Sequence, residues 1–406
     1  MRCASRVLLV LLTFFDVQEQ PPSWYAGRYW LMRLGYYKIH RKKVQAKDWV
    51  WIVDYSIQIG QEKCFVIVGI RLSELPIDRP LTFNDLEPID VVPVTASNGS
   101  LVYKLLEEAT KKTGVPRQII SDHGSDLKSG ITTFTKHHNE TCFIYDIKHK
   151  TAAILKEHFE KDSRWAEFIA LCSQIKRRLQ QTELAFATPP GRRSKARYMN
   201  IDSFILWAIK ALSFVDSQQK SPSERLDKKR IEAQLYELLN FRQDIEQWRE
   251  ILLIVETTEH FVRNKGISHD NAIELEELLK TYSVCPQAQK IKGILLEFVI
   301  NESKKAKENE RLLGSSEIIE SLFGKQKMLE NEQSRSGFTG LILGIGAFLS
   351  STTKEVVEHA LTEVKTCTVI KWVQDKIGTT VQAYRKQYFK PINLEQIQNQ
   401  SLVPEP

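Results

Sequence analysis

The sequence has few of the residues that build metal–thiolate sites or disulfide frameworks. Its six cysteines are scattered along 406 residues, and no two of them form a CxxC pair. Neither zinc-ligand spacing nor a disulfide scaffold is visible, so reduced thiols are expected. Long apolar runs are also scarce. The stretch FTGLILGIGAFL at 338–349 is shorter than the roughly 20 residues that a membrane-spanning helix needs, and we expect no membrane domain.

A strong excess of one charge is also lacking. The chain has 57 Lys and Arg against 50 Asp and Glu, a net charge of +7 that permits an anionic partner without requiring one. The basic residues nevertheless cluster at 33–43, 176–178 and 191–197, and tyrosines lie among them. Such runs are typical of nucleic-acid surfaces and equally compatible with solvated charged faces.

The first residues, MRCASRVLLVLLTFF, have the basic start and apolar run of a signal peptide. They lack a clear small-x-small cleavage site, and the polar residues Asp16, Gln18 and Glu19 follow directly. The alternative is an amphipathic helix left from a larger N-terminal domain.

The first half of the chain predicts a mixed α/β fold. β-Branched and aromatic runs bounded by turn residues indicate strands, and apolar residues at helical spacing between capping residues indicate helices. Three strands in a meander are followed by a helix, a strand, a short helix and a strand, so the later strands are expected to pair in parallel. This is the element order of the ribonuclease H-like fold, with a mixed five-stranded sheet and flanking helices. The predicted strands are 49–57, 63–70, 87–94, 116–121 and 140–147.

The chain changes character from 163 to 312. Apolar residues recur there at spacings of three and four in 230–256, 270–282 and 289–310, and strand signals are absent. We therefore predict an all-helical insertion that interrupts the α/β core.

Two aspartates end apolar strands of the predicted sheet. Asp54 follows WVWIV, and Asp122 follows the strand in IISDHGSD. Because these two strands lie side by side in a sheet of this kind, their ends can bring both carboxylates together. Close carboxylates repel one another unless a cation lies between them, and oxygen ligands favour Mg²⁺ or Mn²⁺. Each aspartate taken alone is also compatible with a turn or a helix cap.

A third acid is needed to hold a second ion, and the segment SSEIIESLFGKQK at 315–327 offers one. Glu320 and Lys327 are two helical turns apart and share a face, which suits a phosphodiester bound between metal and lysine. Glu317, one turn before Glu320, is a rival third ligand. Taken alone, this segment also fits an ordinary surface helix.

Together these features resemble the DDE transposases of bacterial insertion sequences over roughly residues 20–350. IVDYSIQIGQEKCFVIVGI resembles their first hairpin, ISDHGSDL the segment of their second aspartate, and IIESLFGKQK their glutamate helix. YDIKHK at 145–150 resembles a further recurrent segment, and the helical block resembles the insertion domains of some members. The resemblance implies that Asp54, Asp122 and Glu320 are the catalytic metal ligands.

The resemblance also implies a reaction and partners. The enzyme would hydrolyse phosphodiesters at transposon ends and transfer the ends into target DNA, using two Mg²⁺ or Mn²⁺ ions. It would bind double-stranded DNA, act as a homodimer, and work in the cytoplasm at the nucleoid. Asp146 and His149 are weaker site candidates, for which a salt bridge or helix-start role is the alternative. The predicted DNA contacts are Lys327, Lys325, Arg192, Arg193, Arg41 and Lys42.

Two other functions stay open at this stage: a cellular RNase H-like nuclease, and an inactive or N-terminally truncated remnant that only binds DNA. The predicted organisation is a remnant of an N-terminal DNA-binding helical region at 1–20, a basic DNA-contacting segment at 21–47, core at 48–162, helical insertion at 163–312, the final part of the core with the glutamate helix at 313–390, and a flexible tail at 391–406.

Overall fold

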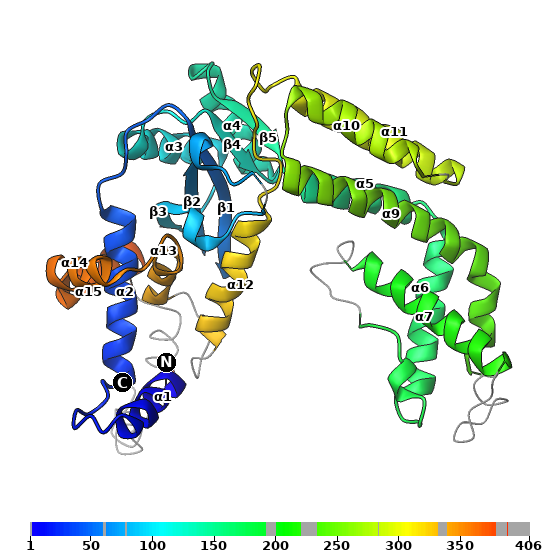
Figure 1. Ribbon diagram of the computed structural model, residues 1–406, viewed down its shortest axis with the longest axis horizontal. Coiled ribbons are helices and arrows are strands. Elements are labelled where there is room, and N and C mark those ends of the chain that lie inside the picture. The colour runs from blue at the N-terminus through cyan, green and yellow to red at the C-terminus, as the bar shows by residue number, and fades with distance from the viewer. Residues whose placement is uncertain are drawn as a thin grey trace, which may run out of the picture. The chain divides into compact units, whose positions relative to one another are not determined.

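The computed structural model describes most of the chain, which divides into two compact units (Figure 1). Unit 1 comprises residues 1–76, 81–143 and 316–406, and unit 2 comprises 77–80 and 144–315. The second unit begins at Ile144, earlier than the predicted start of the insertion at 163, because the helix after the fifth strand packs with the helical part of the chain. The described residues are 2–59, 62–77, 79–191, 200–220, 234–282, 284–331, 339–378 and 388.

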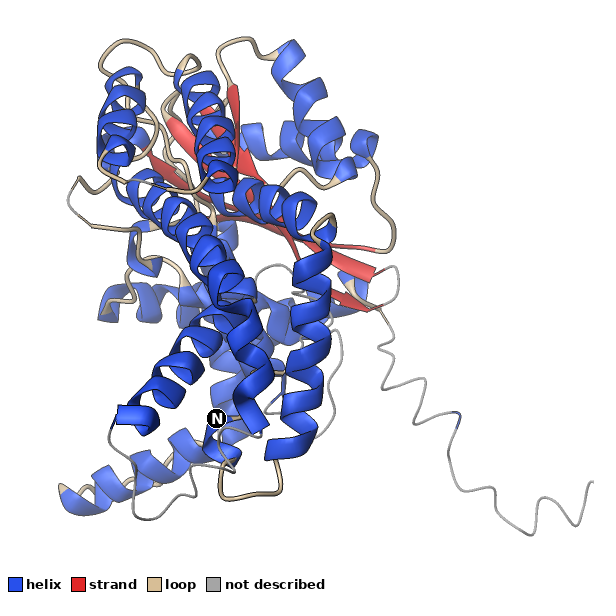
Figure 2. Cartoon of the chain, turned by 90° about the vertical axis from the view of Figure 1, so that its right-hand side faces the viewer, coloured by secondary structure: helices blue, strands red, loops and turns tan. Residues whose placement is uncertain are grey.

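A five-stranded mixed sheet forms the centre of unit 1, with the strand order β3-β2-β1-β4-β5. β1 pairs antiparallel with β2 and parallel with β4, and β2 pairs antiparallel with β3. Helices flank the sheet (Figure 2). This order and these directions confirm the predicted ribonuclease H-like fold. The strands are β1 Trp49–Ile59, β2 Glu62–Arg71, β3 Glu87–Val94, β4 Gln118–Ser121 and β5 Cys142–Tyr145.

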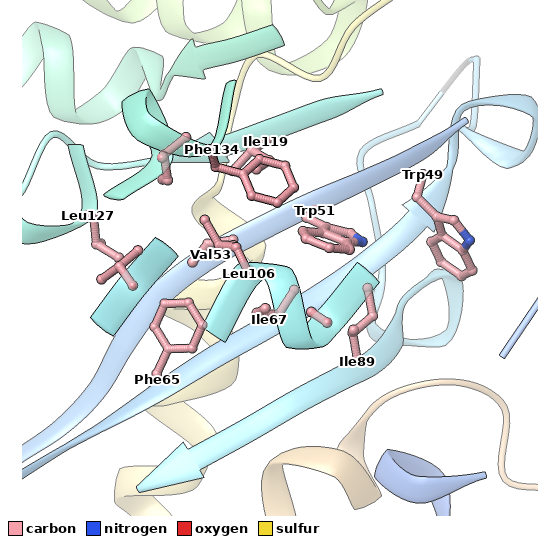
Figure 3. Packing of buried hydrophobic residues seen from close by; sticks show 13 residues of the cluster. Trp49, Trp51, Val53, Phe65, Ile67, Ile89, Leu106, Ile119, Leu127 and Phe134 are labelled. Atoms are coloured by element: carbon pink, nitrogen blue, oxygen red, sulfur yellow. The ribbon is translucent and has the colours of Figure 1, made fainter. Parts of the chain in front are cut away.

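One face of the sheet packs against two helices, α3 (Gly99–Thr113) and α4 (Ser125–His137), as Figure 3 shows. Trp49, Trp51 and Val53 alternate along β1 toward this face, because successive side chains of a strand point to opposite sides. Asn98 caps the start of α3, where its side chain accepts a hydrogen bond from the Leu101 amide at 2.9 Å. It ends at Gly114, whose φ of 85° is a conformation that glycine adopts without strain.

The opposite face of the sheet is also buried. Val50 and Ile52 of β1 are 0% exposed, and they do not belong to the cluster that packs on α3 and α4. The helix α12 (Glu317–Asn331) contacts β1, while α2 (Trp24–His40) and α13 (Gly344–Phe348) contact β3. In Figure 3, α3 lies in front of the strands and the pale yellow α12 behind them. The glutamate helix therefore covers the sheet face opposite α3 and α4.

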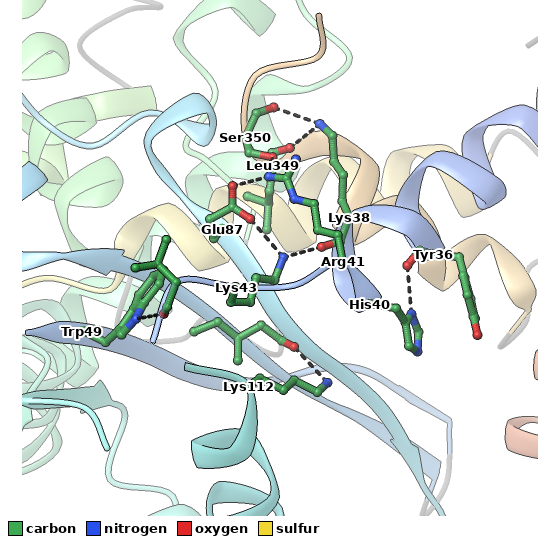
Figure 4. A network of polar contacts seen from close by, with 12 residues as sticks. Tyr36, Lys38, His40, Arg41, Lys43, Trp49, Glu87, Lys112, Leu349 and Ser350 are labelled. Atoms are coloured by element: carbon green, nitrogen blue, oxygen red, sulfur yellow. Dashed lines mark hydrogen bonds and ion pairs between the residues drawn. The ribbon is translucent and has the colours of Figure 1, made fainter. Parts of the chain in front are cut away.

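The basic segment before β1 is held within unit 1 (Figure 4). The Lys38 ammonium is 0% exposed and donates to the carbonyls of Leu349 and Ser350, at 2.6 and 2.9 Å. The Glu87 carboxylate pairs with Arg41 and, at 3.0 Å, with Lys43. Arg33 donates to two carbonyls at the end of α14. Four cations of the run 33–43 thus have partners inside the chain.

The helical unit is built around the long helix α9, which contacts α5, α7, α10 and α11. An aromatic cluster fills its interior: Trp165 and Trp248 meet edge to face with ring centroids 4.9 Å apart, and Phe168 packs on both. Both tryptophans are buried and belong to the core of the helical unit. The remaining α-helices of the described residues are α1 Arg2–Phe14, α5 Ile147–Glu160, α6 Ser163–Leu179, α7 Ile201–Lys220, α9 Arg242–Lys265, α10 His269–Lys280, α11 Pro286–Ser303, α14 Lys354–Glu363 and α15 Thr366–Lys376.

Across the described ranges, no helix combines the length and the apolar character that crossing a bilayer requires.

Candidate active site

The register of two neighbouring parallel strands places two aspartates at the same level. β1 pairs with β4 so that Val50 lies opposite Gln118 and Ile52 opposite Ile120. Continuing this register by two residues puts Asp54 opposite Asp122, which follows directly after β4. Partners in a parallel ladder point to the same face, and neighbouring strands lie about 4.8 Å apart. The continued register brings Asp54 and Asp122 to neighbouring positions at this end of the sheet, and a shared site for their carboxylates stays a prediction.

Both aspartates are half-buried and held by local hydrogen bonds. Asp54 Oδ1 accepts from the Tyr55 amide at 2.6 Å, and Asp122 Oδ1 accepts from the Gly124 amide at 3.1 Å. The lack of a side chain at Gly124 lets the backbone pass close to Asp122, since a Cβ added there would lie 3.2 Å from Asp122 Oδ1.

The third predicted acid lies on the helix that packs on β1. Glu317 and Glu320 occupy the first turn of α12, and both are half-buried. Ile319, Leu322 and Phe323 form the buried stripe of this helix, so Glu320 lies at the edge of the stripe. α12 covers the sheet face toward which Asp54 and Asp122 point.

These three acids do not form a ready metal cage. Among the residues that the structure describes, no group of three or more His, Cys, Asp or Glu side chains is arranged to hold a metal ion. Asp54 and Asp122 supply the oxygen donors that a divalent cation prefers. Glu320 lies on α12, the helix that contacts β1, but within the described part of the chain it does not form a metal-binding group with Asp54 and Asp122.

A second polar group lies at the same end of the sheet, and the sequence reasoning missed it. The Asp126 carboxylate accepts from the Ser97 hydroxyl at 2.5 Å and lies 3.5 Å from the Lys63 ammonium. Ser97 also shares a hydrogen bond with the Tyr55 hydroxyl, and the Lys63 ammonium lies 4.9 Å from the centre of the Tyr55 ring. The signal was present in SDHGSD, where a second aspartate falls in the first turn of α4.

Burial and charge shift the ionisation of this group. Burial raises the pKa of Tyr55 to about 12, against the opposing hydrogen bond from Ser97, and the carboxylates of Asp126 and Asp54 add to the rise. Burial also acts to raise the pKa of Asp126, but the Ser97 hydroxyl and the Lys63 ammonium outweigh it, and the net pKa is lowered. At neutral pH the group therefore contains an ionised Asp126 and a neutral Tyr55.

The predicted DNA-contacting residues differ in their surroundings. Lys327 and Lys325 are exposed on α12, and the Lys325 ammonium lies 4.1 Å from the centre of the Phe83 ring. Lys42 is exposed, whereas Arg41 is engaged with Glu87 and the Ser350 hydroxyl. Arg192 and Arg193 lie outside the described residues.

The weaker candidates have local roles. Asp146 is 1% exposed and caps α5, its Oδ1 accepting from the His149 amide at 2.8 Å. This is the helix-start role named above as the alternative. His123, next to Asp122, packs its ring against Phe143 with centroids 5.1 Å apart.

Comparisons with known proteins found a distant structural similarity. No protein-family model and no curated protein matches the sequence. Among solved structures, the chain is similar to the Drosophila P element transposase strand transfer complex, with a TM-score of 0.38 and 10% identity over 85% of this chain and 88% of that one. A TM-score of this size supports no inference about this chain.

Proposed function

We propose that this chain is a DNA transposase of the DDE type, which hydrolyses phosphodiesters at the ends of a mobile element and joins those ends to target DNA. The observation that carries the proposal is the register of β1 and β4, which pairs Ile52 with Ile120 two residues before Asp54 and Asp122, in a sheet of ribonuclease H-like order. The resemblance of the three acidic segments to those of bacterial insertion-sequence transposases supports the same function.

In this proposal Asp54 and Asp122 hold divalent cations, and Glu320 completes the site when α12 and the strand ends close on them. Bound Mg²⁺ or Mn²⁺ would activate a water and stabilise charge on the scissile phosphate. Of the two glutamates, we favour Glu320 as the third ligand because the exposed Lys327 follows it by two turns on the same helix face. Lys327 would then hold the DNA backbone beside the reacting phosphate.

Two reactions would follow one another at this site. Water attacks the phosphodiester at the element's end and releases a 3′-hydroxyl. That hydroxyl attacks a phosphodiester of the target, forming a new P–O3′ bond as the target's own P–O3′ bond breaks. The number of phosphodiester bonds is unchanged in the second reaction, and no covalent protein intermediate is needed. Bringing two element ends to one target would be the role of a homodimer.

A strand-transfer assay tests the proposal. The substrate is a precleaved DNA end taken from the DNA that flanks the reading frame, incubated with plasmid target and Mn²⁺. We expect joined product from the wild type and none from Asp54→Asn. Glu108→Gln, which changes an exposed carboxylate of α3 paired with Lys111, is the control and should join normally. Nicked plasmid without joined product would favour the nuclease instead.

A second candidate is a protein that binds DNA without cutting it. The observation that favours it is that the three acids form no metal-binding group among the described residues. In that case Asp54→Asn would bind DNA like the wild type, and neither protein would hydrolyse it at any Mn²⁺ concentration.

A further inference from the structure

The polar group around Asp126 links the paired strands β1 and β2 to two segments outside the strands at the same end of the sheet. Tyr55 belongs to β1, Lys63 to β2, Ser97 to the loop before α3, and Asp126 to the first turn of α4. Their contacts run from the Tyr55 hydroxyl to Ser97, from Ser97 to the Asp126 carboxylate, and from that carboxylate to Lys63. We call these four residues the Asp126 group.

This group begins and ends next to the two candidate ligands. Tyr55 follows Asp54 directly in the chain and points to the opposite face of the sheet. At the other end, a Cβ at Gly124 would lie 3.2 Å from Asp122 Oδ1 and 3.5 Å from Asp126 Oδ1, so both carboxylates flank the same glycine. The bonds of Asp126 therefore tether the Asp122 loop to the residue after Asp54.

Strand pairing with β1 does not by itself fix the position of Asp122. The strand ends at Ser121, one residue before Asp122, and the last residue pair of the β1–β4 ladder is Ile52 with Ile120. Asp122 is thus positioned by its loop and by α4 rather than by a strand pair. The Asp126 carboxylate is mostly buried, with 18% of the side chain exposed, and low exposure strengthens its hydrogen bonds.

We propose that Asp126 is a positioning residue, which acts through Ser97 and Tyr55 to hold Asp122 at a fixed spacing from Asp54. The inference rests on the proposed function, because that spacing matters only if the two aspartates share a cation. Residues that orient metal ligands in this way typically change metal affinity by 10- to 100-fold when removed.

Mn²⁺ binding by the intact chain, measured from the free-ion electron paramagnetic resonance signal, gives a readout that is independent of catalysis. We expect Asp126→Ala and Ser97→Ala to weaken Mn²⁺ binding by about tenfold. Asp126→Asn keeps an oxygen that can accept from Ser97 and should restore binding to within about twofold of the wild type. Tyr55→Phe, which removes only the hydroxyl, should weaken binding in the same direction as Ser97→Ala.

The matched control is Glu107→Ala. Glu107 is a partly exposed carboxylate of α3 whose Oε1 lies 2.8 Å from His138 Nε2, so its removal also breaks a side-chain contact between the α3 and α4 segments. It should leave Mn²⁺ binding unchanged. An equal loss from Glu107→Ala would mean general loosening of the α3–α4 pair and would overturn the positioning role.

The outcomes separate this inference from the function on which it rests. If the wild type binds Mn²⁺, Asp54→Asn abolishes the binding, and the Asp126→Ala and Ser97→Ala variants bind like the wild type, the positioning role is wrong and the metal site stands. If the wild type binds no Mn²⁺ up to millimolar concentration, the proposed function fails, and the positioning role fails with it.

Discussion

Two groups of charged residues in unit 1 differ in the partners that their charges have. In the basic group of Lys38, Arg41, Lys43 and Glu87 the two lysines are buried, and the cations donate to carbonyls or to the Glu87 carboxylate. The acidic pair of Asp54 and Asp122 is half-buried at the end of the sheet and accepts from neighbouring backbone amides. Lys38, Arg41 and Lys43 belong to one basic run of the sequence, whereas Asp54 and Asp122 come from separate segments of the chain.

The difference lies in what each arrangement does to stability. A buried cation with good acceptors is held firmly, and losing one partner is costly because the other charge stays buried. Two carboxylates side by side repel one another, so they weaken the fold unless a cation joins them. Substitutions should therefore cost stability in the basic group and function in the acidic pair.

The largest expected effect is on the DNA cleavage that we propose for Asp54 and Asp122. Asp122→Asn keeps the shape of the side chain and removes the charge that would bind a cation. Mn²⁺-dependent DNA cleavage should fall by more than about 100-fold, the upper range for losing a residue that only supports a metal ligand. The urea midpoint should stay unchanged or rise. Cleavage at the wild-type rate would exclude Asp122 from the site.

Glu87→Gln should have the largest effect on stability in the basic group. The substitution leaves Arg41 and Lys43 without their shared counter-charge, and we expect the free energy of unfolding to fall by about 3 kcal/mol. Urea denaturation measures it. The control is Glu108→Gln, in an exposed pair with Lys111, which should cost less than about 1 kcal/mol. Equal losses in the two variants would contradict the distinction between enclosed and exposed pairs.

The pH dependence of stability should also reveal the buried lysines. Burial lowers the pKa of Lys38 and of Lys43 to about 8, from 10.5. Between these values the unfolded chain binds protons that the folded chain does not, so these groups make unfolding less favourable as the pH rises through that window. The difference between the urea midpoint of the wild type and that of Lys43→Met should therefore increase in favour of the wild type from pH 8 to pH 10. The exposed Lys111→Met should show no such trend, and a constant difference for Lys43→Met would contradict the burial of its charge.

The smallest effect separates two neighbours in the same basic run. Lys42 is exposed, and Lys42→Ala should reduce the slope of DNA affinity against salt by about one ion without changing stability. Arg41→Ala should do the reverse, because its guanidinium is engaged with Glu87 and Ser350. Binding titrations at several salt concentrations, with urea midpoints for each variant, measure both. Equal salt slopes and equal urea midpoints for the two variants would contradict the different roles of Lys42 and Arg41.

The sequence predicts the sheet well because its information is local. Runs such as WVWIV and KCFVIVGI indicate strands by composition alone, and the order of elements then restricts how the strands can pair. The prediction that Asp54 and Asp122 lie together follows from that order. The actual limits differ by a few residues, as in β1, which continues to Ile59.

Interactions between distant segments could not be predicted in this way. Nothing local in RLGYYKIHRKK shows that Lys38 meets the carbonyls after α13, more than three hundred residues later. The tether from Asp126 through Ser97 to Tyr55 likewise joins residues that meet only after the sheet forms. The boundary at Ile144 depends on the packing of α5, whose own sequence indicates only a helix.

The most direct measurement is the anomalous diffraction of a crystal of the intact protein soaked in Mn²⁺. A manganese peak within about 2.5 Å of carboxylate oxygens from both Asp54 and Asp122 is the predicted result. Two carboxylates that face apart, with no manganese between them at a concentration that fills other sites, would contradict the account.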